Sequence, residues 1–278
     1  MKIQYLGTAA AEGIPGIFCE CEICKKARKL GGKNIRTRSQ AIIDDTLLID
    51  FPADTYMHSL QYNIPLYKIK TCIITHSHPD HLYPAEVEMR RHGFAHTSSA
   101  EPLTLYADES GYKMLCKVIE RCSISEKDAR AVLIKLCETF FAEGYKITPI
   151  RATHDPSSTP VVYAIEKDGK SIFYAHDTSE LCKESMDWLK TLSKPFDLVS
   201  LDCTQANDPE VPYVGHMNLK KCVLMRDEFI SLGIADKNTV FVANHFSHNG
   251  ANSVYDEFVK IAEKEGFLTS YDGMEVEF

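Results

Sequence analysis

Residues 75–81 bring three imidazoles and a carboxylate together in one short stretch. The segment reads Thr-His-Ser-His-Pro-Asp-His. At the His and Asp frequencies of this chain, the pattern His-x-His-x-Asp-His is expected by chance in about one such sequence in a thousand. Imidazole nitrogens and carboxylate oxygens are ligands of zinc and of other divalent metals. The spacing therefore predicts a metal site that contains four residues of this segment, His76, His78, Asp80 and His81.

An apolar strand, expected over 71–75, leads into this segment. In the extended backbone that leaves the strand, His76 and His78 are two residues apart and share a face. Pro79 restricts His78 to extended backbone and is favoured in the first turn of a helix. We therefore expect a helix that begins at Pro79 and continues through Met89, with the last two ligands in its first turn.

Two metals need more ligands than this segment offers, so distant parts of the chain must supply the others. Loops at strand ends are where binding and catalytic side chains concentrate. Three candidates each follow an expected strand: His154 after 146–150, Asp177 after 171–175 and His245 after 239–243.

The remaining sequence alternates short apolar strands with helical patterns. Ser125 and Asp128 resemble a capping box that opens a helix. Asn218 is expected to cap a second helix, and a third is expected over 254–265. No low-complexity linker and no short internal repeat divides residues 1–278, so the sequence predicts one α/β domain with layered sheets. The expected strands are 2–6, 40–43, 46–50, 71–75, 103–107, 146–150, 161–166, 171–175, 197–202, 239–243 and 275–278.

Composition excludes several classes of protein. The chain has 31 Lys and Arg against 39 Asp and Glu, a net charge of −8, whereas a protein that coats a polyanion needs basic residues in excess. No apolar run approaches the roughly 18 residues of a membrane helix, and residues 1–18 lack the apolar core of a signal peptide. We expect a cytoplasmic protein with no membrane partner, whose ten cysteines are not a disulfide framework.

Three cysteines near the start of the chain, Cys19, Cys21 and Cys24, form a second candidate metal site. The pattern Cys-x-Cys-x-x-Cys is expected by chance in about one chain in a hundred of this composition. A tetrahedral structural zinc needs a fourth ligand. His248 is the best candidate because it lies three residues after His245, so that one loop can serve both sites.

The pattern of ligands resembles that of the metallo-β-lactamase superfamily of binuclear metallohydrolases. The resemblance extends from Tyr5-Leu6-Gly7-Thr8 to Tyr271-Asp272-Gly273-Met274. It implies a four-layer αββα sandwich with two divalent metal ions, zinc or manganese, at one edge of the sheets. It also implies how the ligands divide: His76, His78 and His154 for the first metal, Asp80, His81 and His245 for the second, and Asp177 as the bridge.

The cysteine motif is similar to that of one branch, the phosphoribosyl cyclic phosphodiesterases (PhnP-like). In that branch such a loop and a late His bind a structural zinc remote from the chemistry, which here implies Cys19, Cys21, Cys24 and His248. Residues 7–15 also resemble the opening Gly-Thr-Gly-x-x-x-Gly-x-Pro of the branch, with Ala9 in place of a glycine.

The resemblance favours a phosphodiesterase acting on small phosphodiesters, cyclic ones included. Two divalent ions about 3.5 to 4 Å apart lower the pKa of a shared water from 15.7 toward about 7, so a metal-bridging hydroxide is the expected nucleophile. The charge of the two metals exceeds that of two carboxylates and a hydroxide, which favours an anionic substrate. Asp80 and His216 are the expected catalytic residues. For His216 the reason is that superfamily phosphodiesterases place a His between the bridging Asp and the last ligand, where it protonates the leaving group. Asp202 is the expected orienting partner of His216.

Three alternatives within the superfamily stay open. A tRNA 3′-processing nuclease shares the metal motif and would make nucleic acid a partner, but the long Gly- and Lys-rich arm of those enzymes is not visible in this sequence. A thioesterase or lactonase would use the same hydroxide on carbon. A non-hydrolytic member, such as the coenzyme-biosynthesis branch, is expected to lose a ligand, and none is lost here. Homodimerisation is also left open.

Two further segments bear on the substrate. Between residues 23 and 43 the chain has seven basic residues and no acidic one. We hypothesise that the basic side chains of 25–38 form a rim that steers an anionic substrate, with a solvated helix face as the alternative interpretation. Residues 108–144 are expected to form a helical insertion that either caps the pocket or packs outside it.

Overall fold

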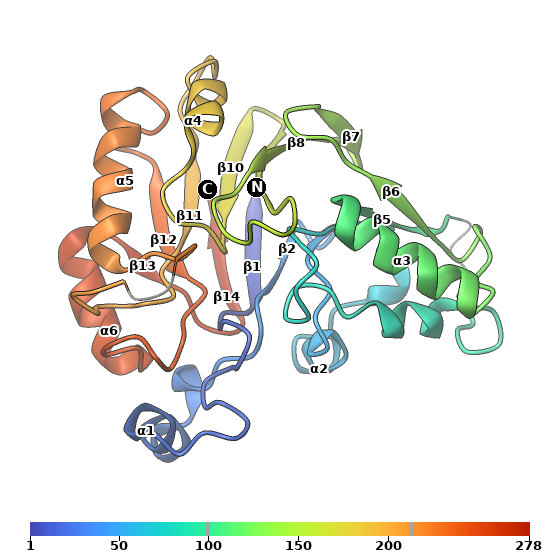
Figure 1. Cartoon of the computed structure of the whole chain (residues 1–278), viewed down its shortest axis with the longest axis horizontal. Helices are drawn as coiled ribbons and strands as arrows, with labels where there is room; N and C mark the ends of the chain where they lie inside the picture. Colours follow the sequence, from blue (N-terminus) through green and yellow to red (C-terminus); the bar gives the residue numbers. More distant parts are fainter. Residues whose placement is uncertain (98–100, 212–213) are drawn as a thin grey trace.

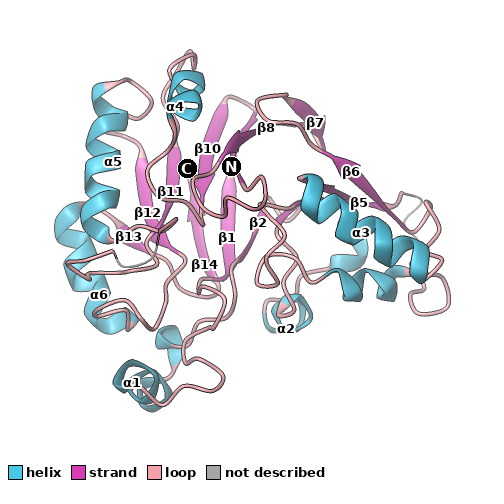
Figure 2. Ribbon diagram, in the orientation of Figure 1, coloured by secondary structure: helices cyan, strands magenta, loops and turns pink. Residues whose placement is uncertain are grey.

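In the computed structural model, two β-sheets lie face to face and helices cover the outer face of each (Figure 1, Figure 2). The structure describes residues 1–97, 101–211 and 214–278. The layers follow one another as helix, sheet, sheet and helix, so the predicted four-layer αββα sandwich is confirmed. None of the described helices is long and apolar enough to cross a membrane.

In the described part of the chain each sheet has seven strands. The first sheet is antiparallel from β14 to β3 and parallel from β3 to β6. Its strands are, in spatial order, β14 (Met274–Glu277), β1 (Lys2–Gly7), β2 (Gln40–Ile43), β3 (Leu47–Ile49), β4 (Thr71–Ile73), β5 (Leu103–Ala107) and β6 (Ala129–Leu133).

The second sheet is parallel from β13 to β10 and antiparallel from β10 to β7. Its strands are, in spatial order, β13 (Leu268–Thr269), β12 (Val240–Asn244), β11 (Leu198–Asp202), β10 (Lys170–Ala175), β9 (Val161–Lys167), β8 (Tyr145–Arg151) and β7 (Phe140–Ala142).

The helices divide between the two outer faces (Figure 1). The first sheet is covered by α2 (Thr55–Gln61), α3 (Glu109–Arg121) and the 3₁₀ helices η2 (Leu66–Lys68) and η3 (Pro84–Arg90). The second sheet is covered by α4 (Lys183–Leu189), α5 (Leu219–Ser231), α6 (Tyr255–Ala262) and η4 (Glu263–Glu265). The short α1 (Glu22–Leu30) lies at the bottom of the view, and η1 (Gly32–Asn34), which follows it, contacts α6 through a hydrogen bond from Asn34 to Asp256.

Alternation along the strands separates the core between the sheets from the cores beneath the helices. In β10, Ile172 and Tyr174 belong to the core between the sheets, whereas Phe173 belongs to the core beneath the helices. Successive side chains of a strand point to opposite faces. Because both faces of this strand are buried after Lys170, its last four residues, Ile-Phe-Tyr-Ala, are aliphatic or aromatic.

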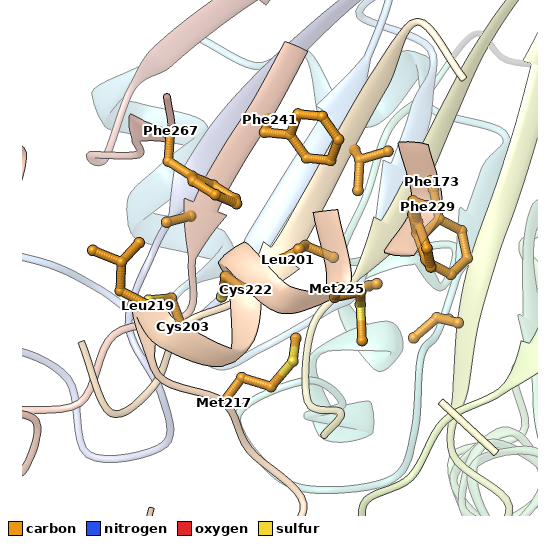
Figure 3. Packing of buried hydrophobic residues seen from close by; sticks show 14 of the residues in the cluster. Phe173, Leu201, Cys203, Met217, Leu219, Cys222, Met225, Phe229, Phe241 and Phe267 are labelled. Carbon is orange, nitrogen blue, oxygen red and sulfur yellow. The ribbon is translucent and has the colours of Figure 1, made fainter. Parts of the chain in front are cut away.

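Helix α5 presents one apolar stripe to the outer face of the second sheet (Figure 3). Phe229 of this stripe packs on Phe173 of β10, with ring centroids 5.8 Å apart. Asn218 caps the helix as predicted, because its side chain accepts the backbone N–H of Lys221 at 2.9 Å. The buried residues of the stripe are three or four positions apart, as a helix face requires: Leu219, Cys222, Met225 and Phe229.

The predicted helix opened by Ser125 is wrong. The Ser125 hydroxyl instead accepts the backbone N–H of Lys127 at 3.2 Å in a local turn, and the chain then enters β6, which pairs in parallel with β5. Only the first part of residues 108–144 is helical, as α3, whereas β6 and β7 add one strand to each sheet. The segment is therefore built into both sheets and is not a helical insertion.

The predicted helix starting at Pro79 is also wrong. Residues 79–83 form turns and a bridge, and the 3₁₀ helix η3 begins only at Pro84. The backbone N–H of Phe51 donates to the His81 carbonyl at 2.7 Å, and that of Tyr83 donates to the Phe51 carbonyl at 2.7 Å. This pairing with Phe51 holds the chain extended just where the helix was expected to continue.

Candidate metal centres

The seven predicted ligands converge from four strand ends. The motif 76–81 follows β4 of the first sheet, whereas His154, Asp177 and His245 follow β8, β10 and β12 of the second. Their ligand atoms fall into two groups, and within each group all atoms lie within 4.8 Å of one another. These groups have the membership that the family resemblance implied.

The first group consists of three imidazoles and one carboxylate: His76, His78, His154 and Asp177. His76 Nε2 lies 2.9 Å from His78 Nδ1, and His154 Nε2 lies 3.3 Å from the same atom. His76 Nε2 also lies 3.3 Å from Asp177 Oδ2. Burial lowers the pKa of His76 well below its ordinary value, so its ring is neutral and keeps a lone pair for a metal.

The second group consists of Asp80, His81, Asp177 and His245, all buried. His81 Nε2 lies 2.6 Å from Asp177 Oδ2 and 3.3 Å from Asp80 Oδ2, while His245 Nε2 lies 3.4 Å from Asp177 Oδ1. Asp177 thus reaches both groups, in the place of a bridging ligand. Burial acts to raise the pKa of Asp177, but the imidazoles of His245 and His81 hold that pKa well below its ordinary value.

The donor set fits two divalent metal ions. His81 Nε2 and His245 Nε2 lie only 3.3 Å apart and face the same carboxylate, an arrangement that a cation between them satisfies. His nitrogens and carboxylate oxygens suit zinc and manganese alike, so the donors do not select between these ions. The residues present can therefore hold the two ions that the family implies.

Contacts behind the ligands fix the orientation of their rings. His81 Nδ1 donates to Asp50 Oδ2 at 2.7 Å, and the fully buried Asp50 also accepts the Thr75 backbone N–H at 2.8 Å. His245 Nδ1 lies 2.9 Å from the Thr204 hydroxyl. Each of these contacts leaves Nε2 of the ring directed at the metal group. Sequence reasoning missed Asp50, although an acidic residue that directly follows an apolar strand is a usable signal.

Three residues of this region have left-handed backbone, a conformation that costs a residue other than glycine about 1–3 kcal/mol. The φ angles are 67° at Asp50, 51° at Asp177 and 65° at His245. The backbone N–H of Asp177 donates to Asp202 Oδ2 at 3.1 Å, which helps to hold its turn in place. The surrounding structure thus enforces these turns, and with them the direction of each side chain.

His216 lies beside the second group and is held by Asp202, as predicted. Its Nδ1 donates to Asp202 Oδ2 at 3.0 Å and lies 3.4 Å from Asp177 Oδ1. The buried Asp202 also accepts the backbone N–H of Met217 at 2.9 Å, so its position is fixed from two sides. Burial opposes protonation of His216, but Asp202 raises its pKa to about 9, which favours a protonated ring at neutral pH.

One further grouping is possible, since His216, Asp202, Asp177 and His245 also lie within 4.8 Å of one another. The Nδ1 atom of His216 is the one that faces both carboxylates. Its contact with Asp202 occupies that atom, which favours a role beside the metals.

The cysteine motif and His248 meet at the start of α1. His248 Nδ1 lies 3.7 Å from Cys19 Sγ and 3.6 Å from Cys21 Sγ, and Cys24 completes a group within 4.8 Å. The Cys24 sulfur accepts the Gly16 backbone N–H at 3.2 Å, and the Cys21 sulfur caps α1. Backbone donors of this kind stabilise thiolates, and the tetrad of three sulfurs and one nitrogen suits a closed tetrahedral zinc site.

An open pocket of about 390 Å³ lies over the binuclear groups. Its lining includes six of the predicted site residues, His78, Asp80, His154, Asp177, His216 and His245. Glu12 lines it from an N-terminal loop, Ser247 and Asn249 line it from the loop that bears His245, and sequence reasoning missed all three.

The hypothesised basic rim is not formed as expected. Among the described residues, none of the basic side chains of 25–38 lines the pocket. Arg36 is buried, where it donates to the Thr8 hydroxyl at 2.8 Å and stacks on Phe246. Arg38 pairs with Asp54 at 3.0 Å. At least two of the seven charges therefore serve the structure of the N-terminal loops.

Comparisons with known proteins agree with this architecture. Solved structures with a similar fold include Zn²⁺-bound PqqB from Methylobacterium extorquens, 19% identical with a TM-score of 0.76 over all of both chains. A diphosphatase of the PhnP family is 21% identical with a TM-score of 0.74, covering 100% of this chain and 97% of that one. Human tRNase Z, short form, is 16% identical with a TM-score of 0.68, covering 100% and 99%.

At these identities the similarity to solved structures shows the fold alone, and no curated protein matches the chain. The decisive match is to the family model described as the beta-lactamase superfamily domain, which covers residues 47–230. That span is more than half of the chain and contains six of the seven predicted ligands, from His76 to Asp177, whereas His245 lies after it. The protein belongs to the β-lactamase superfamily and has its metal-dependent hydrolase fold.

Proposed function

We propose that this protein is a binuclear metal-dependent phosphodiesterase that acts on small phosphodiesters, cyclic ones included. The observation that carries the proposal is the placement of Asp177 between two ligand groups, with His216 beside them at the same pocket. Two divalent ions held there would activate a water at neutral pH and neutralise charge on the phosphoryl oxygens.

The residues of the chain divide the remaining work. Asp202 orients the His216 ring through Nδ1, which leaves Nε2 free to protonate the departing oxygen of the ester. Asp80 and Asp177 supply the only carboxylates among the seven proposed ligands, so a site with two divalent ions stays net positive. Such a site favours an anionic phosphodiester over a neutral amide.

The pocket supports a small substrate. A volume of about 390 Å³ lies within the range of roughly 300–1,000 Å³ that is usual for small-molecule sites. The structural similarity to a diphosphatase of the PhnP family is consistent with phosphoryl chemistry. The similarity to human tRNase Z keeps a nuclease as one outcome of the test.

The test combines metal analysis of purified protein with a panel of substrates. The panel contains bis(4-nitrophenyl) phosphate, a 2′,3′-cyclic nucleotide, a thioester, a lactone and a precursor tRNA. We expect two metals beyond the thiolate zinc and hydrolysis of the phosphodiesters. Asp80→Ala should abolish that hydrolysis, whereas Asp45→Ala, an exposed carboxylate paired with Lys2, is the matched control. Full activity of Asp80→Ala, or turnover of the thioester or lactone alone, would overturn the proposal.

A further inference from the structure

Glu12 lies between the binuclear groups and the cysteine site and belongs to neither set of candidate ligands. Its side chain lines the pocket over the binuclear groups and is 30% exposed. The same side chain lies 3.7 Å from His248 Nε2, on the far edge of the ring that faces the cysteines. One carboxylate therefore touches the thiolate site and the proposed substrate site at once.

The contacts of Glu12 are uneven between its two oxygens. Oε1 accepts the Ser247 hydroxyl and the Asn249 side-chain amide, the latter at 3.2 Å, and it is also the oxygen nearest to His248. Among the residues that the structure describes, none forms a hydrogen bond with Oε2. The Glu12 side chain is 30% exposed at the pocket, so Oε2 can accept a hydrogen bond from a ligand in place of one from water.

The backbone makes the connection rigid. The loop that bears Glu12 is joined to the loop 245–248 by a hydrogen bond from the Ala10 N–H to the Phe246 carbonyl, 2.9 Å, and by one from the Phe246 N–H to the Thr8 carbonyl, 2.9 Å. A side chain at Gly16 would meet His248 Nε2 at 3.0 Å, so this ring is enclosed from a second side. The position of Glu12 is thus tied to the ring that binds at the thiolate site.

Histidines that bind a metal through one nitrogen usually donate the other N–H to a carboxylate or carbonyl, which fixes the tautomer. With Nδ1 facing Cys19 and Cys21, Nε2 is the nitrogen of His248 that must donate. Glu12 Oε1 lies 3.7 Å from this nitrogen, longer than a hydrogen bond but close enough for one to form after a small movement of either side chain. The same contact holds the carboxylate in place at the pocket.

We propose that Glu12 is a positioning and specificity-determining residue that links the thiolate site to the substrate pocket. Through Oε1 it holds His248 in the tautomer that binds zinc, and through Oε2 it accepts a hydrogen bond from a neutral hydroxyl of the substrate. The substrate half of this proposal rests on the proposed phosphodiesterase function. It predicts a phosphodiester that carries a hydroxyl group near the scissile phosphate and no second anionic group at that position.

The first arm of the test measures zinc without any substrate. Transfer of thiolate-bound zinc to a chromogenic chelator is followed in the whole protein, with the binuclear sites loaded with manganese. We expect Glu12→Ala to weaken zinc binding about 10–100-fold, and Glu12→Gln, which keeps an acceptor oxygen, to restore most of the affinity. Glu20→Ala, an exposed carboxylate of the same cysteine loop, is the control. Equal zinc affinity in Glu12→Ala and Glu20→Ala would refute the link.

The second arm compares thymidine 5′-(4-nitrophenyl phosphate) with its 3′-deoxy counterpart, which lacks one neutral hydroxyl. A hydrogen bond to a partly exposed charged group corresponds to about a tenfold difference in KM between the two substrates of the unaltered protein. In Glu12→Ala we expect that ratio to fall to about one. A ratio that is the same in both proteins would refute the substrate half. If the unaltered protein hydrolyses neither these two compounds nor the phosphodiesters of the substrate panel, the proposed function fails, while the zinc measurement still decides the role of Glu12 toward His248.

Discussion

Replacement of Asp50 by Asn should weaken the binding of one metal ion and leave the fold of the protein unchanged. In the structure, the Asp50 carboxylate accepts His81 Nδ1 at 2.7 Å, the Thr75 N–H at 2.8 Å and the Thr75 hydroxyl at 2.9 Å. An Asn side chain fills the same space but offers one acceptor oxygen and an NH₂ group. The Thr75 donors can retain the oxygen, and the NH₂ group then faces His81 Nδ1.

That exchange reverses the tautomer of His81. If Nδ1 must accept a hydrogen bond, the proton of the neutral ring moves to Nε2, which is the atom that faces Asp177 and Asp80. Loss of such an orienting carboxylate usually lowers metal affinity about 10–100-fold, or roughly 1.4–2.7 kcal/mol of binding free energy. We expect this loss at the group of Asp80, His81, Asp177 and His245.

The assay is metal content after dialysis against buffers of set free-metal concentration, with Asp45→Asn as the control. The variant should lose half of its active-site metal at a free concentration 10–100 times higher than the control, while circular dichroism stays unchanged. The group of His76, His78 and His154 should keep its metal under the same conditions. Two metals retained with unaltered affinity would show that Asp50 does not set the tautomer, and the reasoning from its contacts would be wrong.

Three more changes test other parts of the structure. His216→Asn should lower kcat for a phosphodiester about 10²–10⁴-fold with both active-site metals retained, because the ring is held by Asp202 and is not one of the seven proposed ligands. Loss of a metal in this variant would show instead that His216 is a ligand. Cys24→Ser should remove the zinc of the thiolate site and make the loop before α1 susceptible to limited proteolysis. The control is Cys137→Ser, a change at an exposed cysteine, and unchanged zinc content in Cys24→Ser would contradict a four-ligand site. Phe229→Ala should lower the free energy of unfolding, measured by urea denaturation, by about 3–5 kcal/mol, because the ring is fully buried on the second sheet. Leu224→Ala, a change at an exposed residue of the same helix, should alter it by less than about 0.5 kcal/mol. Similar losses in the two variants would refute the packing argument.

The site residues that the sequence could predict are those with rare types at a set spacing. His76, His78, Asp80 and His81 together form the rare pattern, and the ends of apolar strands then single out His154, Asp177 and His245. Their convergence in two groups follows from the topology, because each strand end that bears them opens on the same pocket. His216 follows no strand, and its prediction rests instead on the family resemblance.

Other residues could not be predicted because their roles depend on contacts between distant segments. Glu12 and Asp50 are common acidic residues, and only the folded chain places one against His248 and the other against His81. Local signals also failed where a distant partner competed with them. The turn at Ser125 leads into a strand because β5 offers an edge for pairing. In the same way, the backbone hydrogen bonds of Phe51 with His81 and Tyr83 hold the chain extended after His81.

The pairing of β1 with β14 bears on how this protein is made. Lys2 lies opposite Glu277, so the two strands come from widely separated parts of the chain. During synthesis β1 emerges long before β14 and keeps one row of backbone N–H and C=O groups without a partner. Unpaired strand edges recruit other chains, and contacts of such long sequence separation form slowly. Nascent chains that stall before residue 274 should therefore depend on chaperones far more than the finished protein does.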